Sequence, residues 1–102
     1  MIPKPKKIRS KKITKSAKGE SCTLRIPGVC NHNNETVVFC HAPSIEKGMG
    51  TKSDDYWGAY GCSSCHKFID EHVPKNARAD YFYDGICETQ KRLIEKGIIQ
   101  IK

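Results

Sequence analysis

The chain has 102 residues, of which 37% are hydrophobic and six are cysteines, and its formal net charge is +7. This length predicts one small domain with a modest core, of the kind that disulfides or a metal ion often reinforce. No apolar run approaches the roughly 18 residues of a membrane span, and the N-terminal segment lacks the apolar stretch of a signal peptide. We therefore expect a cytoplasmic protein with no membrane partner.

The positive charge is concentrated at the N-terminus. Residues 1–19 contain eight basic residues and no acidic one, whereas the rest of the chain contains ten basic and eleven acidic residues. A lysine-rich segment with two prolines is typical of a flexible or partly helical arm. We assign residues 1–18 to such an arm and residues 19–102 to the folded domain. The arm suits contact with nucleic-acid phosphates; a solubilising tail is the alternative.

After the arm, the sequence predicts a turn and then a β-hairpin. Pro27-Gly28, between Cys22 and Cys30, is a strong turn signal. The β-branched and aromatic residues 36–40 predict a strand that delivers His41 at its end. A flexible loop from Gly48 to Asp55 follows, and the aromatic residues 56–60 are interpreted as the returning strand.

Two helices follow the hairpin. The first is predicted to begin at the Cys62–His66 segment and to run to about His72. The second is expected to start near Pro74, a residue common in the first turn of a helix, and to stop at Gly97. Apolar residues at mostly helical spacing predict that one of its faces packs on the domain. Cys87 falls within this helix, where a buried, unpaired thiol is the expected reading.

Four cysteines form two pairs, Cys22 with Cys30 and Cys62 with Cys65. Two such turns can place four thiolates around one zinc ion, and a closed shell of this kind is structural. The alternatives are that His66 or Cys40 replaces one cysteine, that Cys62 and Cys65 form a redox pair, or that the six cysteines form disulfides. An intracellular location favours the metal.

His66 and Asp70 are four residues apart and therefore share one face of the first helix. An imidazole and a carboxylate on one face can hold a divalent cation with open positions for a substrate. His41, at the end of the strand, is expected to oppose that face and to act as a base. This layout is typical of a metal-assisted hydrolase. The alternative is that the histidines are structural and Asp70 is solvated.

The stretches RIPGVCN (residues 25–31) and CSSCH (residues 62–66), with ETVV and GTK between them, resemble the YbcO-type prophage nuclease family, which is related to the HNH, or ββα-metal, endonucleases. The resemblance is strong over residues 17–72. It implies an α+β fold in which a ββα-metal finger is stapled by a four-cysteine zinc knuckle and followed by a C-terminal helix.

The resemblance also implies roles for individual residues. His41 occupies the place of the general base, and His66 that of a ligand to the catalytic cation, with Asp70 one helical turn further on. Two positions depart from the family pattern. Cys40 stands where HNH enzymes carry an acidic or histidine ligand, and a soft thiol is a poor magnesium ligand. The central asparagine has no clear counterpart, Asp55 being the nearest candidate.

The sequence therefore predicts a DNA endonuclease with a structural zinc ion and a catalytic magnesium or other divalent cation. Catalytic residues would be His41, His66 and Asp70. Activity could depend on a protein partner, and the oligomeric state is left open. The alternative is a non-catalytic zinc module that binds DNA or a protein.

Overall fold

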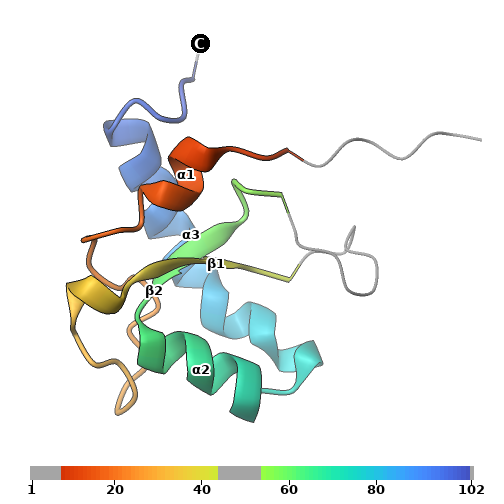
Figure 1. The fold of residues 1–102 in the computed structure, drawn as a ribbon. Helices are drawn as coiled ribbons and strands as arrows, with labels where there is room; N and C mark the ends of the chain where they lie inside the picture. The colour runs from red at the N-terminus through yellow and green to blue at the C-terminus, as the bar shows by residue number, and fades with distance from the viewer. Residues whose placement is uncertain (1–7, 44–53, 102) are drawn as a thin grey trace, which may run out of the picture.

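The structure is a computed structural model that describes residues 8–43 and 54–101. Its elements in chain order are helix α1 (Lys11–Lys15), 3-10 helix η1 (Asn34–Thr36), strands β1 (Val38–His41) and β2 (Gly58–Gly61), helix α2 (Ser63–His72), 3-10 helix η2 (Lys75–Ala77) and helix α3 (Arg78–Glu95). Figure 1 shows α1 and α2 on either side of the hairpin in this view. The predicted α+β class is confirmed. None of the described helices is long and apolar enough to cross a membrane.

The two strands form an antiparallel sheet in which Phe39 is opposite Tyr60 and Cys40 is opposite Ala59. β1 begins two residues later than predicted because the Thr36 hydroxyl donates a hydrogen bond to the Asn33 carbonyl and holds Thr36 in η1. β2 likewise starts at Gly58 rather than at residue 56. Most of the predicted loop between the strands lies outside the described residues.

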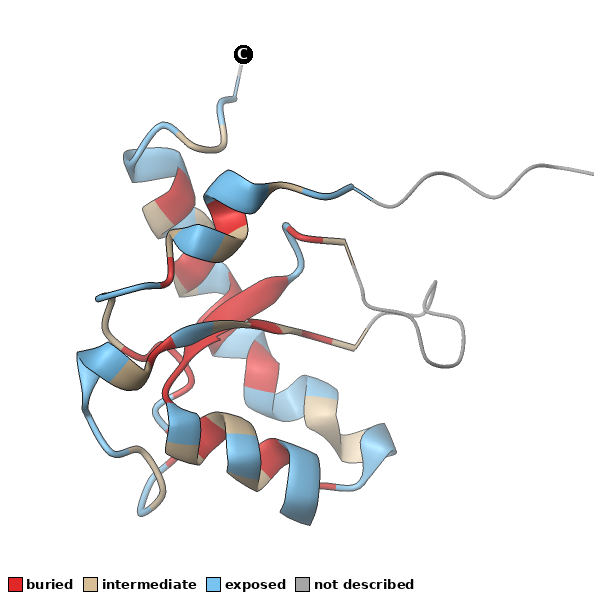
Figure 2. Cartoon of the chain, viewed as in Figure 1, coloured by how far each residue is buried: buried red, intermediate tan, exposed pale blue. Residues whose placement is uncertain are grey.

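Helix α3 packs against strand β2 of the sheet (Figure 1). Figure 2 shows strand β2 buried along its whole length, strand β1 only partly buried, and buried stripes on the helices around them. The buried positions of α3 recur every three or four residues, as helical periodicity requires, and are Phe82, Gly85, Ile86, Thr89 and Leu93. Gly97 ends the helix with a φ of 75°, and the Ile98 N–H donates to the Leu93 carbonyl. Both predicted helices are present, but α3 begins at Arg78, after η2, rather than near Pro74.

The prediction for Cys87 was wrong, because its side chain is exposed. Cys87 follows the buried Ile86 by one residue, and one residue rotates the side chain by about 100° around a helix. The thiol therefore lies on the solvent side of α3. Tyr81 and Ile94, which are next to the buried Phe82 and Leu93, are 40% and 41% exposed for the same reason.

Helix α1 changes the interpretation of the N-terminal arm. Ile13 and Ala17 are buried, with 6% and 1% exposure, and α1 contacts β1. The Ser16 hydroxyl, at the end of α1, lies 2.8 Å from the hydroxyl of Tyr60 on β2. The boundary predicted at residue 18 therefore falls within packed structure, because two apolar side chains anchor a segment whose charge alone suggested a free arm.

A buried polar network joins the sheet to α3 and to the segment after α1. Thr23 Oγ1 donates to the Tyr60 carbonyl at 3.0 Å and also lies 3.0 Å from Thr89 Oγ1. Thr89 Oγ1 accepts a hydrogen bond from the Tyr60 N–H at 3.1 Å. The network satisfies the outer edge of β2, which would otherwise carry unpaired buried backbone groups.

Candidate functional site

The four predicted cysteines form one cluster. Their sulfur atoms all lie within 4.8 Å of one another, and the Sγ atoms of Cys30 and Cys62 are 3.8 Å apart. Tetrahedral coordination with metal–sulfur bonds of about 2.3 Å places sulfurs roughly 3.8 Å apart. The side chains are free thiols, not disulfides. Because these separations fit a tetrahedral four-thiolate site, the cluster can hold a metal ion.

Local backbone structure brings the cysteines together from three parts of the chain. Between Cys22 and Cys30 the chain turns at Gly28, whose φ is 75°, and the Cys30 N–H donates to the Ile26 carbonyl. Cys62 caps the N-terminus of α2, with its Sγ accepting from the Cys65 N–H at 3.4 Å. The Cys62 N–H in turn donates to Cys22 Sγ at 3.3 Å. Backbone N–H groups in these turns therefore donate hydrogen bonds to the sulfur atoms of the cluster.

The surroundings of the cluster shift the pKa values of its thiols in opposite directions. Burial raises the pKa of Cys62, but hydrogen bonds from the N–H groups of Asn31 and Cys65 outweigh it, so the pKa falls to about 7. Burial raises the pKa of Cys65. Several thiolates this close together repel one another, so a full set requires a positive ion between them.

His66 and Asp70 lie on successive turns of α2. His66 Nε2 is 3.4 Å from Asp70 Oδ2, and the two side chains are 45% and 59% exposed. An imidazole nitrogen and a carboxylate oxygen therefore lie close together on the surface of α2, the helix whose N-terminal end carries Cys62 and Cys65. These donors fit a divalent cation that keeps several waters.

Cys40 is a buried residue of β1. The residue is 2% exposed, and its Sγ lies 3.7 Å from the Val38 carbonyl oxygen. Burial raises the pKa of the thiol to about 12, and the negative charges of Cys22 and Asp70 contribute to the increase. A protonated, buried thiol is not a ligand for a hard cation. Cys40, which departs from the HNH pattern, is therefore a core residue.

His41 is paired with a buried aspartate. Its Nε2 lies 2.8 Å from Asp55 Oδ1, and the two side chains are 18% and 7% exposed. Successive strand residues point to opposite faces, so His41 faces away from Cys40. Among the described residues, His41 forms its ion pair with Asp55, whereas His66 pairs with Asp70. The two histidines therefore belong to two separate pairs, His41 with Asp55 and His66 with Asp70.

Asp55 also forms hydrogen bonds with the N-terminal segment. Its carboxylate accepts hydrogen bonds from the Ser10 N–H at 2.6 Å and from the Arg9 guanidinium at 3.3 Å. The Asp55 N–H donates to the Ile8 carbonyl at 2.8 Å. Burial raises the pKa of Asp55, but the hydrogen bonds from His41, Ser10 and Arg9 outweigh it and lower the pKa below its usual value. The carboxylate therefore remains ionised near neutral pH.

Sequence reasoning named Asp55 only as a stand-in for a missing asparagine, and it missed Arg9 and Ser10. The contact between Asp55 and Ser10 spans 45 residues of sequence. Nothing in the local pattern around either residue signals it. The doublet Asp54-Asp55 beside an aromatic stretch is the one local hint that an acidic group is held at the hairpin.

The fold and the cluster together define a small α+β domain built around a four-cysteine site that can hold a metal ion. Residues 11–98 match the family described as "Putative nuclease YbcO", and the chain belongs to that family. The resemblance seen in the sequence is thereby confirmed.

Relatives of known name extend over almost the whole chain. It is 36% identical over 92 residues to "Putative nuclease YbcO" of Escherichia coli (strain K12), a match that covers 86% of this chain and 96% of the relative. The same identity and coverage hold for "Putative nuclease ybcO" of Enterobacteria phage 82. Among solved structures, "a putative bacteriophage protein from Escherichia coli str. K-12 substr. MG1655" is 33% identical with a TM-score of 0.64, covering 83% of this chain and 99% of that one.

Proposed function

We propose that the protein is a metal-dependent endonuclease that hydrolyses phosphodiester bonds in DNA, built on an HNH-like ββα-metal scaffold. The relatives named as nucleases support the reaction class. The single observation that carries the mechanism is the pairing of His41 with the buried carboxylate of Asp55 at 2.8 Å. This arrangement is the one that orients a histidine for proton transfer.

The pairing assigns a role to each nitrogen of His41. Nε2 faces an ionised carboxylate and therefore carries the proton that it donates to Asp55. In the neutral ring the lone pair is then on Nδ1, which is the atom that accepts a proton from the attacking water. As the ring becomes positively charged, the negative charge of Asp55 stabilises it. Asp55 is thus a positioning residue for the base.

His66 and Asp70 are the residues that would hold the catalytic cation, magnesium or another divalent ion. When bound, such a cation stabilises negative charge on the phosphate and on the departing 3′-oxygen. The two side chains contribute a nitrogen and a carboxylate oxygen on one exposed face of α2. Cys40, buried and protonated, takes no part in binding it.

The four-cysteine cluster is assigned a structural zinc ion. Its connection to the chemistry is mechanical, because Cys62 caps α2 and the His66 N–H donates to the Cys62 carbonyl at 3.0 Å. The turn that would hold the ion therefore also fixes the first turn of the helix that carries His66. The basic N-terminal segment is assigned to the DNA backbone, and a protein partner would act outside this machinery.

The cation site is tested by plasmid nicking with zinc-loaded protein and added magnesium, manganese or nickel. Wild-type protein is expected to convert supercoiled DNA to the nicked form only when a divalent cation is added. His66→Ala and Asp70→Asn should each need a higher cation concentration. Glu71→Gln, which removes an adjacent exposed acid from the same helix, is the matched control and should behave as wild type. An absence of nicking with every metal would favour a non-catalytic zinc module.

A further inference from the structure

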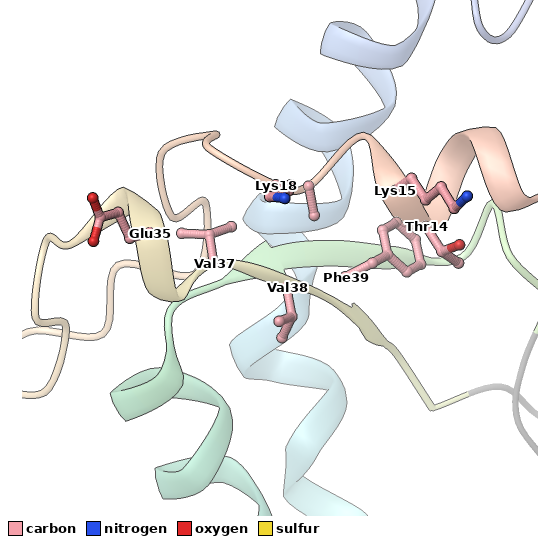
Figure 3. Close-up of a pocket in the computed structure, with 8 residues that line it drawn as sticks. Thr14, Lys15, Lys18, Glu35, Val37, Val38 and Phe39 are labelled. Carbon is pink, nitrogen blue, oxygen red and sulfur yellow. The ribbon is translucent and has the colours of Figure 1, made fainter.

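A groove runs between α1 and β1. Its volume is about 570 Å³, and its lining residues come from α1, the segment after it, η1 and β1. Figure 3 shows Lys15, Thr14 and Lys18 on the α1 side of the groove and Val37 and Phe39 on the β1 side, with the Val38 side chain on the opposite side of the strand. The mechanism proposed above does not use this groove.

One wall of the groove is the open edge of the sheet. The Ala42 N–H donates to the Trp57 carbonyl, and hydrogen-bonded and non-hydrogen-bonded pairs alternate along an antiparallel ladder. Phe39 and Tyr60 are therefore a non-hydrogen-bonded pair. Tyr60 uses its backbone groups on the α3 side, with Thr89 and Thr23. The N–H and C=O of Phe39 consequently point to the outer edge of β1, where the described residues supply no third strand.

The groove has a charge gradient along its length. Lys15 and Lys18 are exposed and stand at the Phe39 end and the middle, whereas the exposed Glu35 lies at the other end (Figure 3). His41 comes two residues after Phe39 on β1, and the two rings meet edge to face with centroids 5.2 Å apart. The positive part of the groove thus leads toward the histidine.

We propose that this groove binds one strand of DNA through its sugar–phosphate backbone and leads it toward His41. Lys15, Lys18 and the Phe39 N–H are donors for phosphate oxygens, and the half-buried side chain of Phe39 accommodates a sugar above the buried floor of Ala17 and Val37. Charge complementarity selects a polyanion over a neutral extended peptide at the open strand edge. Glu35 repels phosphate and marks where the strand leaves the groove. The proposal rests on the proposed nuclease function and deepens it by assigning a substrate subsite.

The test is fluorescence anisotropy of labelled single-stranded and duplex DNA oligonucleotides with full-length, zinc-loaded protein and no added cation, so that binding is read without cutting. The variant is Lys15→Gln with Lys18→Gln. The control is Lys75→Gln with Lys91→Gln, which removes the same charge from exposed positions on η2 and α3. Thermal melting of both establishes that each variant is folded.

Loss of the groove lysines should weaken binding about tenfold at low salt. It should also reduce the slope of log K against log salt by roughly 1.4 for a single strand, because each lost phosphate contact contributes about 0.7. Glu35→Gln should tighten binding. Equal affinities for the two double variants would overturn the groove. If the wild-type protein does not nick DNA but its DNA binding weakens when Lys15 and Lys18 are replaced, the proposed nuclease function is contradicted and the proposed DNA-binding groove is supported.

Discussion

His41 and Asp55 are 14 residues apart in sequence, yet His41 Nε2 lies 2.8 Å from Asp55 Oδ1 at the end of the two-stranded sheet. The same carboxylate accepts the backbone N–H of Ser10 and the guanidinium of Arg9. One buried group thus ties the N-terminal basic segment to the residue assigned as the base. A phosphate backbone bound by that segment would be held beside His41.

Asp55→Asn should destabilise the protein by about 1–3 kcal/mol at neutral pH, because His41, Ser10 and Arg9 lose their charged acceptor. The lowered pKa of Asp55 means that its carboxylate stabilises the fold above the ordinary aspartate value of about 3.9. This contribution is lost as the pH falls through the lower, folded-state pKa. The difference between wild type and variant should therefore shrink below about pH 4. Chemical denaturation across that range measures it, and a constant difference would contradict the assignment.

Cys62→Ser should abolish metal binding and the cooperative fold. A structural zinc ion contributes on the order of 10–16 kcal/mol in small domains, which is as large as the whole stability of a typical protein, about 5–15 kcal/mol. Metal content by mass spectrometry and a thermal melt provide the measurement. Cys87→Ser is the matched control, since this thiol is exposed on α3 and outside the cluster. A folded Cys62→Ser protein with wild-type metal content would show that the cluster is misassigned.

Thr89→Val should cost about 1–3 kcal/mol, because it leaves the buried N–H of Tyr60 without an acceptor while preserving shape. Thr89 is fully buried, so water cannot replace the hydroxyl. Thr89→Ser keeps the hydrogen bond and should be the milder change. Urea denaturation of the two variants compares them. If Thr89→Val is as stable as Thr89→Ser, the hydrogen-bond network does not contribute to holding α3 against β2.

The local elements of the fold were largely predictable from sequence. Helix α2 follows from the C-x2-C-H segment and ends at His72 as expected, and Gly97 stops α3 because glycine readily adopts a positive φ. The clustering of the cysteines followed from the chemistry of thiolates and from the turn at Pro27-Gly28.

Tertiary contacts were the part that sequence patterns did not reveal. The arm was assigned from its charge, whereas Ile13 and Ala17 decide where α1 lies. Asp55 meets His41 because two strands pair, and no spacing rule connects an aspartate before one strand with a histidine ending the other. The side of α3 on which Cys87 lies depends on the exact phase of the helix, which the mixed apolar pattern left ambiguous.

The most direct test of the central claim is the rate of plasmid nicking by His41→Ala under the cation conditions in which the wild type is active. The matched control is His72→Ala, which removes an exposed histidine from the end of α2. General-base catalysis contributes roughly 10²–10⁴-fold, so His41→Ala should lose activity on that order while retaining metal content, fold and DNA binding. His72→Ala should nick at the wild-type rate. A His41→Ala protein that cuts as fast as the control would contradict the account.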